Sequence, residues 1–334
     1  MASIGELWHN ARNPPADPQS LGLSFKDKAV LVTGAYGEGL GANAAIKYAA
    51  LGANPLILGT RTAEKGELAK SAIIERTGCS PDIFIIEPVD LASFESVKRF
   101  AENVSQRVPA LHVVQLAGGV SPWKYAKTPD GHEASVGINL LSSALLALLL
   151  LPKLREAAKA PSPDGFRPHL SILNSIVTFT VSEKKLPSDG QKLVQRCDDE
   201  SKWDPIQQYL LVKLATWYAT KGIAQIFAEH DPDIIVNATC PGLCKTNMAR
   251  DVPRVFKIFM AIQNYFLART AEMGSRTLVS ATGLGPESHG KFWTNDKYHA
   301  MDGFLATERS DALYPETWSE IVSILRPHVP EGIL

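Results

Sequence analysis

The fold of this chain is decided by one stretch near its start, Lys28-Ala29-Val30-Leu31-Val32-Thr33-Gly34-Ala35-Tyr36-Gly37-Glu38-Gly39-Leu40-Gly41. Its first six residues form an apolar, β-branched run that is typical of a fully buried strand. A glycine turn follows, and residues 42–51 then predict a helix that Gly52 caps at its C-terminus. A glycine turn between a strand and a helix lets the backbone approach a pyrophosphate, and the helix N-terminus attracts that anion. A glycine turn alone is weak evidence for such a site, so the rest of the chain has to support it.

The same alternation of strand and helix continues beyond this stretch. Further strands are expected at residues 54–58, 82–87, 111–116, 169–174, 233–239 and 290–294. Helices are expected at residues 63–75, 93–106, 131–158, 205–218, 252–281 and 310–325. Strands that alternate with helices of this length indicate a parallel sheet with right-handed crossovers. The sequence therefore predicts an α/β fold, a single Rossmann-type, doubly wound parallel sheet of about seven strands with helices on both faces.

No linker interrupts this alternation, so we expect one domain with extensions. Residues 1–27 are polar and proline-containing and are expected to form an N-terminal arm, and residues 28–334 the dinucleotide-binding and catalytic domain. The charged insertion at about 176–204 is expected to be a lid or a substrate wall, although a disordered surface loop would have the same composition. The helical segment at about 247–285 is expected to cap the substrate. Its apolar part could equally pack in the core, and it lacks the basic face of a membrane-surface helix.

Composition excludes several classes of protein. The chain has 334 residues, a formal net charge of -1, 45% hydrophobic and 21% charged residues, as in soluble globular proteins. This near-neutral balance argues against a nucleic-acid partner. The apolar run Leu140–Leu151 is shorter than the roughly 20 residues that span a bilayer, so we expect a buried helix and no integral membrane segment. Four sparse cysteines, no metal-ligand spacing and no secretory signal predict reduced thiols, no metal and a cytoplasmic protein.

A second candidate motif is the pair Tyr209 and Lys213. Asp204 is expected to cap the helix that carries them, with Pro205 as its first residue. Residues four apart share one face of a helix, so the phenol and the ammonium group point into the same space. A nearby cation lowers the pKa of a phenol from its usual value of about 10, which would let this pair transfer a proton near neutral pH. An amphipathic helix with a lysine extending to solvent explains the same two residues.

The ends of the expected strands decide between these two interpretations. Ligands of parallel α/β sheets bind at the carboxyl ends of the strands. Residues with the chemistry of a dinucleotide site fall at those ends, namely Arg61, Asp90, Ala117-Gly118, Ser175 and Pro241-Gly242. This agreement favours a functional role for Tyr209 and Lys213.

Together these motifs resemble the short-chain dehydrogenase/reductase family from about Lys28 to the final helix. The glycine motif is Thr33-Gly34…Gly39-Leu40-Gly41, and Gln115-Leu116-Ala117-Gly118 stands where the family has Asn-Asn-Ala-Gly or Leu-Asn-Ala-Gly. Asp90-Leu91 resembles the family's adenine contact, and Pro241-Gly242…Thr246 the segment that receives the nicotinamide carboxamide. The N-terminal arm, the long insertion and Ser288-His289-Gly290-Lys291 look most like fungal members, many of which serve secondary metabolism.

The resemblance implies a role for each matching residue. Tyr209 would be the general acid or base, Lys213 would lower its pKa and bind the nicotinamide ribose, and Ser175 would hold the substrate oxygen. Asn139 would hold a water in a proton relay. The residues expected to bind the cofactor are Thr33, Gly34, Tyr36, Gly39, Leu40, Arg61, Asp90, Leu91, Ala117, Gly118, Tyr209, Lys213, Pro241, Gly242 and Thr246.

Arg61 decides the expected cofactor. NAD sites usually place an acid at the end of the second strand, where this chain has Gly59-Thr60-Arg61. Because a guanidinium suits a 2′-phosphate, we expect NADP(H), although Arg61 could instead be a solvated residue at a helix start. The expected function is an NADP(H)-dependent oxidoreductase acting on a carbonyl or alcohol of a largely apolar small molecule. A homodimer is a possible assembly. The alternatives are a non-redox isomerase, dehydratase or cyclase on the same fold, and a non-enzymatic dinucleotide sensor.

Three departures from the family pattern concern the same site. The glycine turn is one residue longer than usual and carries Glu38, which would repel a pyrophosphate unless it points away or caps the helix. Leu116 replaces an asparagine whose hydrogen bonds tie the fourth strand to its neighbour, so altered local structure is expected there. The connection from Ser175 to Tyr209 is much longer than in compact members.

Overall fold

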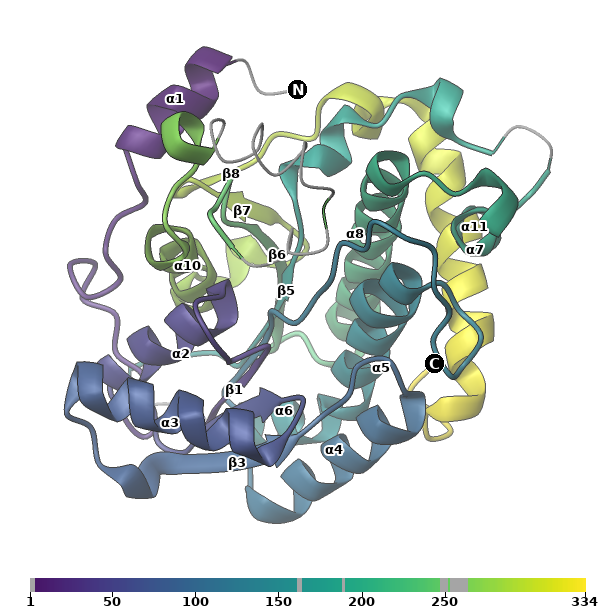
Figure 1. The fold of residues 1–334 in the computed structure, drawn as a ribbon. Helices are drawn as coiled ribbons and strands as arrows, with labels where there is room; N and C mark the ends of the chain where they lie inside the picture. The colour runs from purple at the N-terminus through teal and green to yellow at the C-terminus, as the bar shows by residue number, and fades with distance from the viewer. Residues whose placement is uncertain (1–3, 161–163, 188–189, 247–251, 253–263) are drawn as a thin grey trace.

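The molecule is built around one eight-stranded sheet in the order β3-β2-β1-β4-β5-β6-β7-β8 (Figure 1). The computed structural model describes residues 4–160, 164–187, 190–246, 252 and 264–334. The strands are β1 Val30–Thr33, β2 Leu56–Thr60, β3 Phe84–Pro88, β4 Val113–Leu116, β5 His169–Leu173, β6 Ile235–Cys240, β7 Phe292–Thr294 and β8 Lys297–Tyr298. The first seven are parallel, and the strand order reverses between β1 and β4, which is where doubly wound sheets bind ligands.

The predicted fold class is confirmed, with one correction at the edge of the sheet. β8 runs antiparallel to β7 and was not expected. A tight turn joins the two strands through Asn295 and Asp296, whose φ angles of 51° and 55° lie in the left-handed region that such hairpins require. A strand of two residues carries too little periodicity to be recognised in a sequence.

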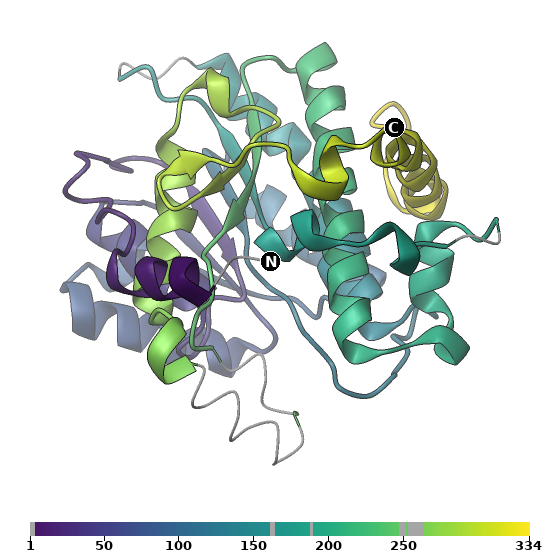
Figure 2. The same cartoon turned by 90° about the horizontal axis from the view of Figure 1, so that it is seen from above.

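Alternating side chains along each strand pack into two separate hydrophobic cores, one on each face of the sheet. Leu31 packs into one core, and its neighbours Val30 and Val32 pack into the other. This alternation follows from the two-residue period of a strand. Each core is closed by its own layer of helices, seen on opposite sides of the sheet in Figures 1 and 2. One layer contains α2 Leu40–Ala50, α3 Ala63–Thr77 and α10 Ala271–Ser280, and the other α4 Phe94–Arg107, α5 Ser142–Leu149 and α8 Pro205–His230.

The helix expected at 131–158 is divided into three parts. A π-helical turn at Val136–Leu141 leads into α5, and α6 Leu151–Lys159 follows after a break at Leu150. The leucine-rich run is buried, as predicted. Within the described ranges no single helix is long and apolar enough to cross a membrane, while Val136–Leu149 and Leu151–Lys159, bent by 42°, pass that test of length and composition only as a pair.

Three further helices belong to the N-terminal arm, the insertion and the C-terminal part of the chain. The expected arm contains the helix α1 Ile4–Arg12, and the insertion contains α7 Leu193–Asp198. The last helix, α11 Glu308–Leu325, packs against both α8 and α7 (Figure 1). The predicted capping segment at 247–285 lies partly outside the described residues, and its described α-helical parts are residues 264–267 and α10.

Candidate active site

The turn between β1 and α2 forms a cradle that only glycine can line. Gly34 has a φ of +70°, and a Cβ atom there would lie 2.9 Å from the Cα of Gly118 on the next loop. A Cβ on Gly41 would lie 2.7 Å from the carbonyl oxygen of Gly34. Gly39 is the N-cap of α2 and has no side chain to bond the first amides of the helix. Those amides suit a pyrophosphate, so the residues present fit a bound dinucleotide.

The loop after β4 forms the other wall of this cradle. The Thr33 hydroxyl oxygen accepts hydrogen bonds from the backbone amides of Ala117 at 3.0 Å and Gly118 at 3.1 Å. Leu91 packs against Gly118, where a Cβ would come within 2.6 Å of a leucine methyl carbon. Gln115 Nε2 donates to the carbonyl oxygen of Ser171 on β5 at 3.2 Å. Thr33 and Gln115 thus tie β4 to its neighbours even though Leu116 cannot.

Two basic side chains stand near the carboxyl ends of β2 and β3. Arg61 follows β2 directly, and its Nε lies 4.0 Å from Oδ1 of Asp90, with both side chains about half exposed. Lys65 Nζ lies 5.3 Å from the centre of the Tyr36 ring. Sequence reasoning missed Lys65, although its place one helical turn after Arg61 was a usable signal. Glu38 is exposed in the turn between β1 and α2, two residues after Tyr36.

Tyr209 lies in the second turn of α8, which Asp204 caps. Asp204 Oδ1 accepts hydrogen bonds from the amides of Ile206 at 3.1 Å and Gln207 at 2.8 Å. The Tyr209 phenol lies close enough to the side chain of Ser175, just after β5, for Ser175 to lower its pKa. Burial raises the pKa of Tyr209 to about 12 and outweighs this effect of Ser175. Burial is the largest cause of the shift, so its direction is opposite to the lowering that the sequence predicted.

Lys213 is buried one turn further along α8. Its ammonium group donates to the carbonyl oxygen of Leu173 at 3.0 Å, and its exposed fraction is 7%. Burial lowers the pKa of Lys213 to about 8. The thiol of Cys240 at the end of β6 is close enough to influence the pKa of both Tyr209 and Lys213.

Cys240 also connects the end of β5 to the end of β6. Its role in the site was not predicted from the sequence. Its sulfur accepts hydrogen bonds from the amides of Ile176, just after Ser175, at 3.2 Å and of Gly242 at 3.4 Å. Its position immediately before Pro241-Gly242 was the available signal. The thiol therefore fixes the loop that carries Ser175 relative to the segment after β6.

Asn139 lies in the π-helical turn and positions the loop after β4. Its Oδ1 accepts from the amide of Val120 and its Nδ2 donates to the Val120 carbonyl, each at 2.8 Å. Both ends of the side-chain amide thus contact one residue. The expected role of Asn139 in a water relay stays a prediction.

The segment after β6 completes the site. Gly242 has a φ of +74°, and the carbonyl oxygen of Pro241 accepts from Nη1 of Arg269 at 3.3 Å. Thr246 is partly buried at the end of the described part of this segment. The structure therefore brings the expected residues together around the ends of β1, β4, β5 and β6, while Arg61 and Asp90 lie at the ends of β2 and β3.

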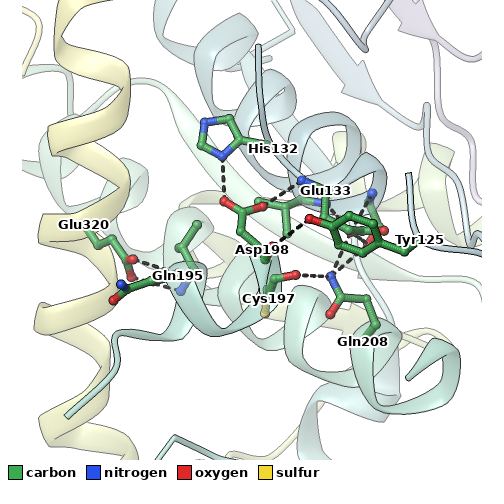
Figure 3. A network of polar contacts seen from close by, with 11 residues as sticks. Tyr125, His132, Glu133, Gln195, Cys197, Asp198, Gln208 and Glu320 are labelled. Carbon is green, nitrogen blue, oxygen red and sulfur yellow. Dashed lines mark hydrogen bonds and ion pairs between the residues drawn. The ribbon is translucent and has the colours of Figure 1, made fainter. Parts of the chain in front are cut away.

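A polar network fixes the insertion beside the Tyr209 helix (Figure 3). Asp198 at the end of α7 contacts His132 Nδ1 at 2.7 Å and accepts from the Glu133 amide at 2.7 Å. Gln208, next to Tyr209, donates to the Glu133 carboxylate at 2.8 Å and to the Cys197 carbonyl at 2.9 Å. The described part of the insertion is therefore packed against the start of α8.

The other end of α7 is held by the C-terminal helix. The Glu320 carboxylate on α11 accepts from the amides of Val194 at 2.9 Å and Gln195 at 2.8 Å. Burial raises the pKa of Glu320. A carboxylate at the start of a helix is favourable, because the first amides have no partner within the helix.

The fold and this site together define a Rossmann-type dinucleotide-binding oxidoreductase. A family model described as short chain dehydrogenase matches residues 28–161. The chain is 35% identical to "Short-chain dehydrogenase/reductase ffsI" of Aspergillus flavipes, over 99% of this chain and 94% of the relative. It is 36% identical to "Short-chain dehydrogenase/reductase phmF" of Phaeosphaeria nodorum, over 97% of this chain and 93% of the relative. The chain belongs to the short-chain dehydrogenase/reductase family, whose members bind a nicotinamide dinucleotide, and these relatives are fungal, as the resemblance implied.

Solved structures support the same fold. A crystal structure of an uncharacterized protein from Mycobacterium paratuberculosis matches with a TM-score of 0.64 and 22% identity, covering 95% of this chain and 97% of that chain. The NADPH-bound carbonyl reductase from chicken fatty liver matches with a TM-score of 0.60 and 18% identity, covering 85% of this chain and 98% of that chain. At these identities the likeness concerns the architecture.

Proposed function

We propose that this chain is an NADP(H)-dependent oxidoreductase that reduces a carbonyl group, or oxidises an alcohol, of a largely apolar small molecule in secondary metabolism. The observation that carries the proposal is that the side chains of Tyr209 and Ser175 meet beyond the end of β5, close enough for the Ser175 hydroxyl to lower the pKa of the phenol. The buried Lys213 lies one turn after Tyr209 on α8. The glycine cradle lies at the switch point of the sheet, where β1 and β4 end. A proton donor, an oxygen-binding hydroxyl and a dinucleotide cradle in one place suit hydride transfer.

The proposed roles follow from the chemistry of each group. The Ser175 hydroxyl holds the substrate oxygen and stabilises its developing charge. Tyr209 remains a phenol at neutral pH, since its pKa is about 12, and so can donate a proton to the oxygen of a reduced carbonyl. Lys213 would hydrogen-bond the nicotinamide ribose of the bound cofactor. The bound cofactor supplies the hydride.

The proposed preference for NADP(H) rests on Arg61 and Lys65. Arg61 is half exposed directly after β2, and its planar guanidinium can pair with two oxygens of a 2′-phosphate. Lys65 adds a second positive charge beside Tyr36. Gly59-Thr60-Arg61 includes no carboxylate that would take the ribose hydroxyls of NAD.

Cofactor binding tests the first part of the proposal. NADPH should raise the melting temperature of the wild type more than NADH at equal concentration. Arg61→Ser should weaken NADPH binding at least tenfold and leave NADH binding unchanged. The matched control is Arg76→Ser, because Arg76 is exposed in the last turn of α3. Equal stabilisation by both cofactors, with equal loss in Arg61→Ser, would contradict the proposed preference.

Turnover tests the second part. A panel of aromatic and aliphatic ketones, including 9,10-phenanthrenequinone, is mixed with the protein and NADPH, and absorbance at 340 nm and product mass are followed. Tyr209→Phe should lower the rate by roughly 10²–10⁴-fold, the usual contribution of a general acid, and should keep the melting shift produced by NADPH. A product of unchanged mass without NADPH consumption would instead support a non-redox reaction. Unaltered biological output of Tyr209→Phe would support a sensor.

A further inference from the structure

The N-terminal helix α1 contacts the residues that surround the proposed catalytic centre. Its partly buried positions are Leu7, Asn10 and Ala11, which share one face, and its neighbouring positions are exposed. A cavity of about 30 Å³ lies against this face. It is lined by Leu7, Asn10, Ala11, Ile176, Gly242, Leu243, Leu267, Arg269, Thr294 and Asn295. The partly buried face of α1 therefore lies against the carboxyl ends of β5, β6 and β7.

The partners of α1 across this cavity are adjacent in sequence to the reacting groups. Ile176 follows Ser175, and its amide is bonded to Cys240. Gly242 and Leu243 belong to the segment that directly follows β6. In Figure 1, α1 lies at the end of the molecule where β5 finishes and the insertion begins. A helix that only covered the outside of the domain would not meet these residues.

Arg269 holds α1 in this position. Its side chain is 2% exposed, and its Nε donates to the Asn10 carbonyl at 2.6 Å and its Nη2 to the Asn13 carbonyl at 3.3 Å. These carbonyls are at the C-terminal end of α1, where the last turn of a helix has unpaired acceptors and a partial negative charge. A cation at that end is therefore favourable.

The same guanidinium contacts the segment after β6. Its Nη1 donates to the Pro241 carbonyl at 3.3 Å. The Arg269 backbone amide donates to Leu243, and the Arg269 carbonyl accepts from the Lys245 amide, each at 2.8 Å. One buried residue thus links the helix to the segment beside the proposed nicotinamide position.

Two further contacts hold the chain that follows α1. The amide of Ala16 donates to the Asp296 carboxylate in the β7–β8 turn at 2.6 Å. Arg276 on α10 donates to the Pro15 carbonyl at 3.2 Å. The start of the chain is therefore fixed at several points along its path and not by α1 alone.

We propose that α1 is a wall of the substrate site, that Leu7, Asn10 and Ala11 help to select the substrate, and that Arg269 is the positioning residue that holds this wall against the segment after β6. The inference rests on the proposed function, because it assumes that the reaction takes place beside Ser175. The aliphatic side chains of Leu7, Ala11 and Ile176 line this cavity, so the selected part of the substrate is apolar. The cavity has room for only one or two water-sized groups, so a larger side chain on this face of α1 would press on Ile176 and Gly242, next to the proposed site.

The first test compares the same substitution on two faces of α1. Ala11→Phe fills the inner face, and the matched control His9→Phe adds the same ring on the exposed face. The probes are a bulky diketone, 9,10-phenanthrenequinone, and a small one, 2,3-butanedione. Ala11→Phe should lower kcat/KM for the bulky probe at least tenfold relative to the small one, and His9→Phe should change neither value by more than twofold. An unchanged ratio in Ala11→Phe, or the same change in His9→Phe, would overturn the inference.

The second test does not depend on turnover. Amide hydrogen exchange of residues 7–13 is measured in the wild type with NADP⁺ and with 2′,5′-ADP, which matches only the adenine end of the cofactor. NADP⁺ should slow exchange at these amides at least fivefold, and 2′,5′-ADP should not. If both molecules bind and neither slows exchange at 7–13, α1 does not adjoin the site. If neither molecule binds, the proposed function fails, which is a separate outcome.

Arg269→Met tests the positioning residue. It removes the bonds to α1 and to Pro241 while keeping the apolar stem of the side chain. Exchange of residues 7–13 should become at least tenfold faster, and NADP⁺ affinity should fall more than 2′,5′-ADP affinity. A residue that only stabilised the fold would lower the melting temperature and leave the ratio of the two affinities unchanged.

Discussion

Lys213 carries a charge in a position that disfavours it. The side chain is buried and its ammonium group donates to the Leu173 carbonyl at 3.0 Å. Removal from water disfavours the charged form of a lysine, which is why its pKa falls to about 8. The residue is therefore protonated at neutral pH but loses its charge within the range in which enzymes are commonly assayed.

This pKa predicts a pH dependence that belongs to Lys213. Because the ammonium form is the one that can donate to the ribose of the cofactor, kcat/KM for NADPH should be level below pH 8 and fall roughly tenfold per pH unit above it. Steady-state kinetics from pH 6 to 10 measure this profile. In Lys213→Arg the remaining activity should stay level to the highest pH, since a guanidinium does not titrate there. The same falling limb in that variant would assign it to another group.

Residues could be predicted where a motif or a strand end marks them. Ser175, Tyr209 and Lys213 follow from their spacing and from the carboxyl end of a strand. The bond from Cys240 to the amide of Ile176 joins positions 64 apart, and no local pattern encodes it. The direction of the shift in the Tyr209 pKa could not be predicted from the sequence either, because it depends on how deeply the phenol is buried.

At the scale of elements, the start of α8 controls the position of Tyr209. Asp204 bonds two of the first amides of the helix, and Pro205 suits the first helical position. Gln208 then fixes the first turn to Glu133 and Cys197. A loosened first turn would move the phenol that lies just beyond it.

We expect Asp204→Ala to cost about 1 kcal/mol of unfolding free energy, the usual effect of removing an N-cap. Asp204→Asn should retain most of that energy. The matched control is Ser93→Ala, because Ser93 caps a different helix, α4, through the amide of Ser96. Urea unfolding should give similar losses for both alanine variants, and kcat should fall only in Asp204→Ala. An equal fall in kcat in Ser93→Ala would show that general destabilisation, not the position of α8, lowers activity.

Elements with long periodic patterns were predictable, and elements that depend on distant partners were not. The strand, turn and helix around Gly34 follow from local sequence. α1 lies in a polar, proline-containing arm, and its C-terminal end is held by Arg269, more than 250 positions away. The π-helical turn at Val136–Leu141 is bonded through Asn139 to Val120, so its shape also depends on another segment.

At the scale of the whole molecule, the two ends of the sheet have different tasks. The proposed chemistry lies where β5 ends, and His169 lies where β5 begins, paired with Ile235 of β6. His169 is buried, with Nδ1 2.6 Å from the Arg167 carbonyl and Nε2 3.0 Å from the Leu284 carbonyl. These contacts connect β5 to the loop that follows α10. Burial outweighs both carbonyls and lowers the pKa of His169 to about 4.

This lowered pKa predicts that the fold loses stability in mild acid. The unfolded chain binds a proton at His169 near pH 6.5, whereas the folded chain resists it until about pH 4. The contribution of His169 is therefore complete above pH 6.5 and is lost as the pH falls to about 4, by about 3 kcal/mol in all. Urea unfolding at pH 7.0 and pH 4.5 measures the loss, and the decisive quantity is the difference between wild type and variant, because carboxyl groups titrate in the same range. His169→Gln should be less stable than the wild type at pH 7 but should show a smaller loss between the two pH values. The matched control His230→Gln, at an exposed helix end, should keep the wild-type loss, and an equal loss in His169→Gln would place the acid-sensitive group elsewhere.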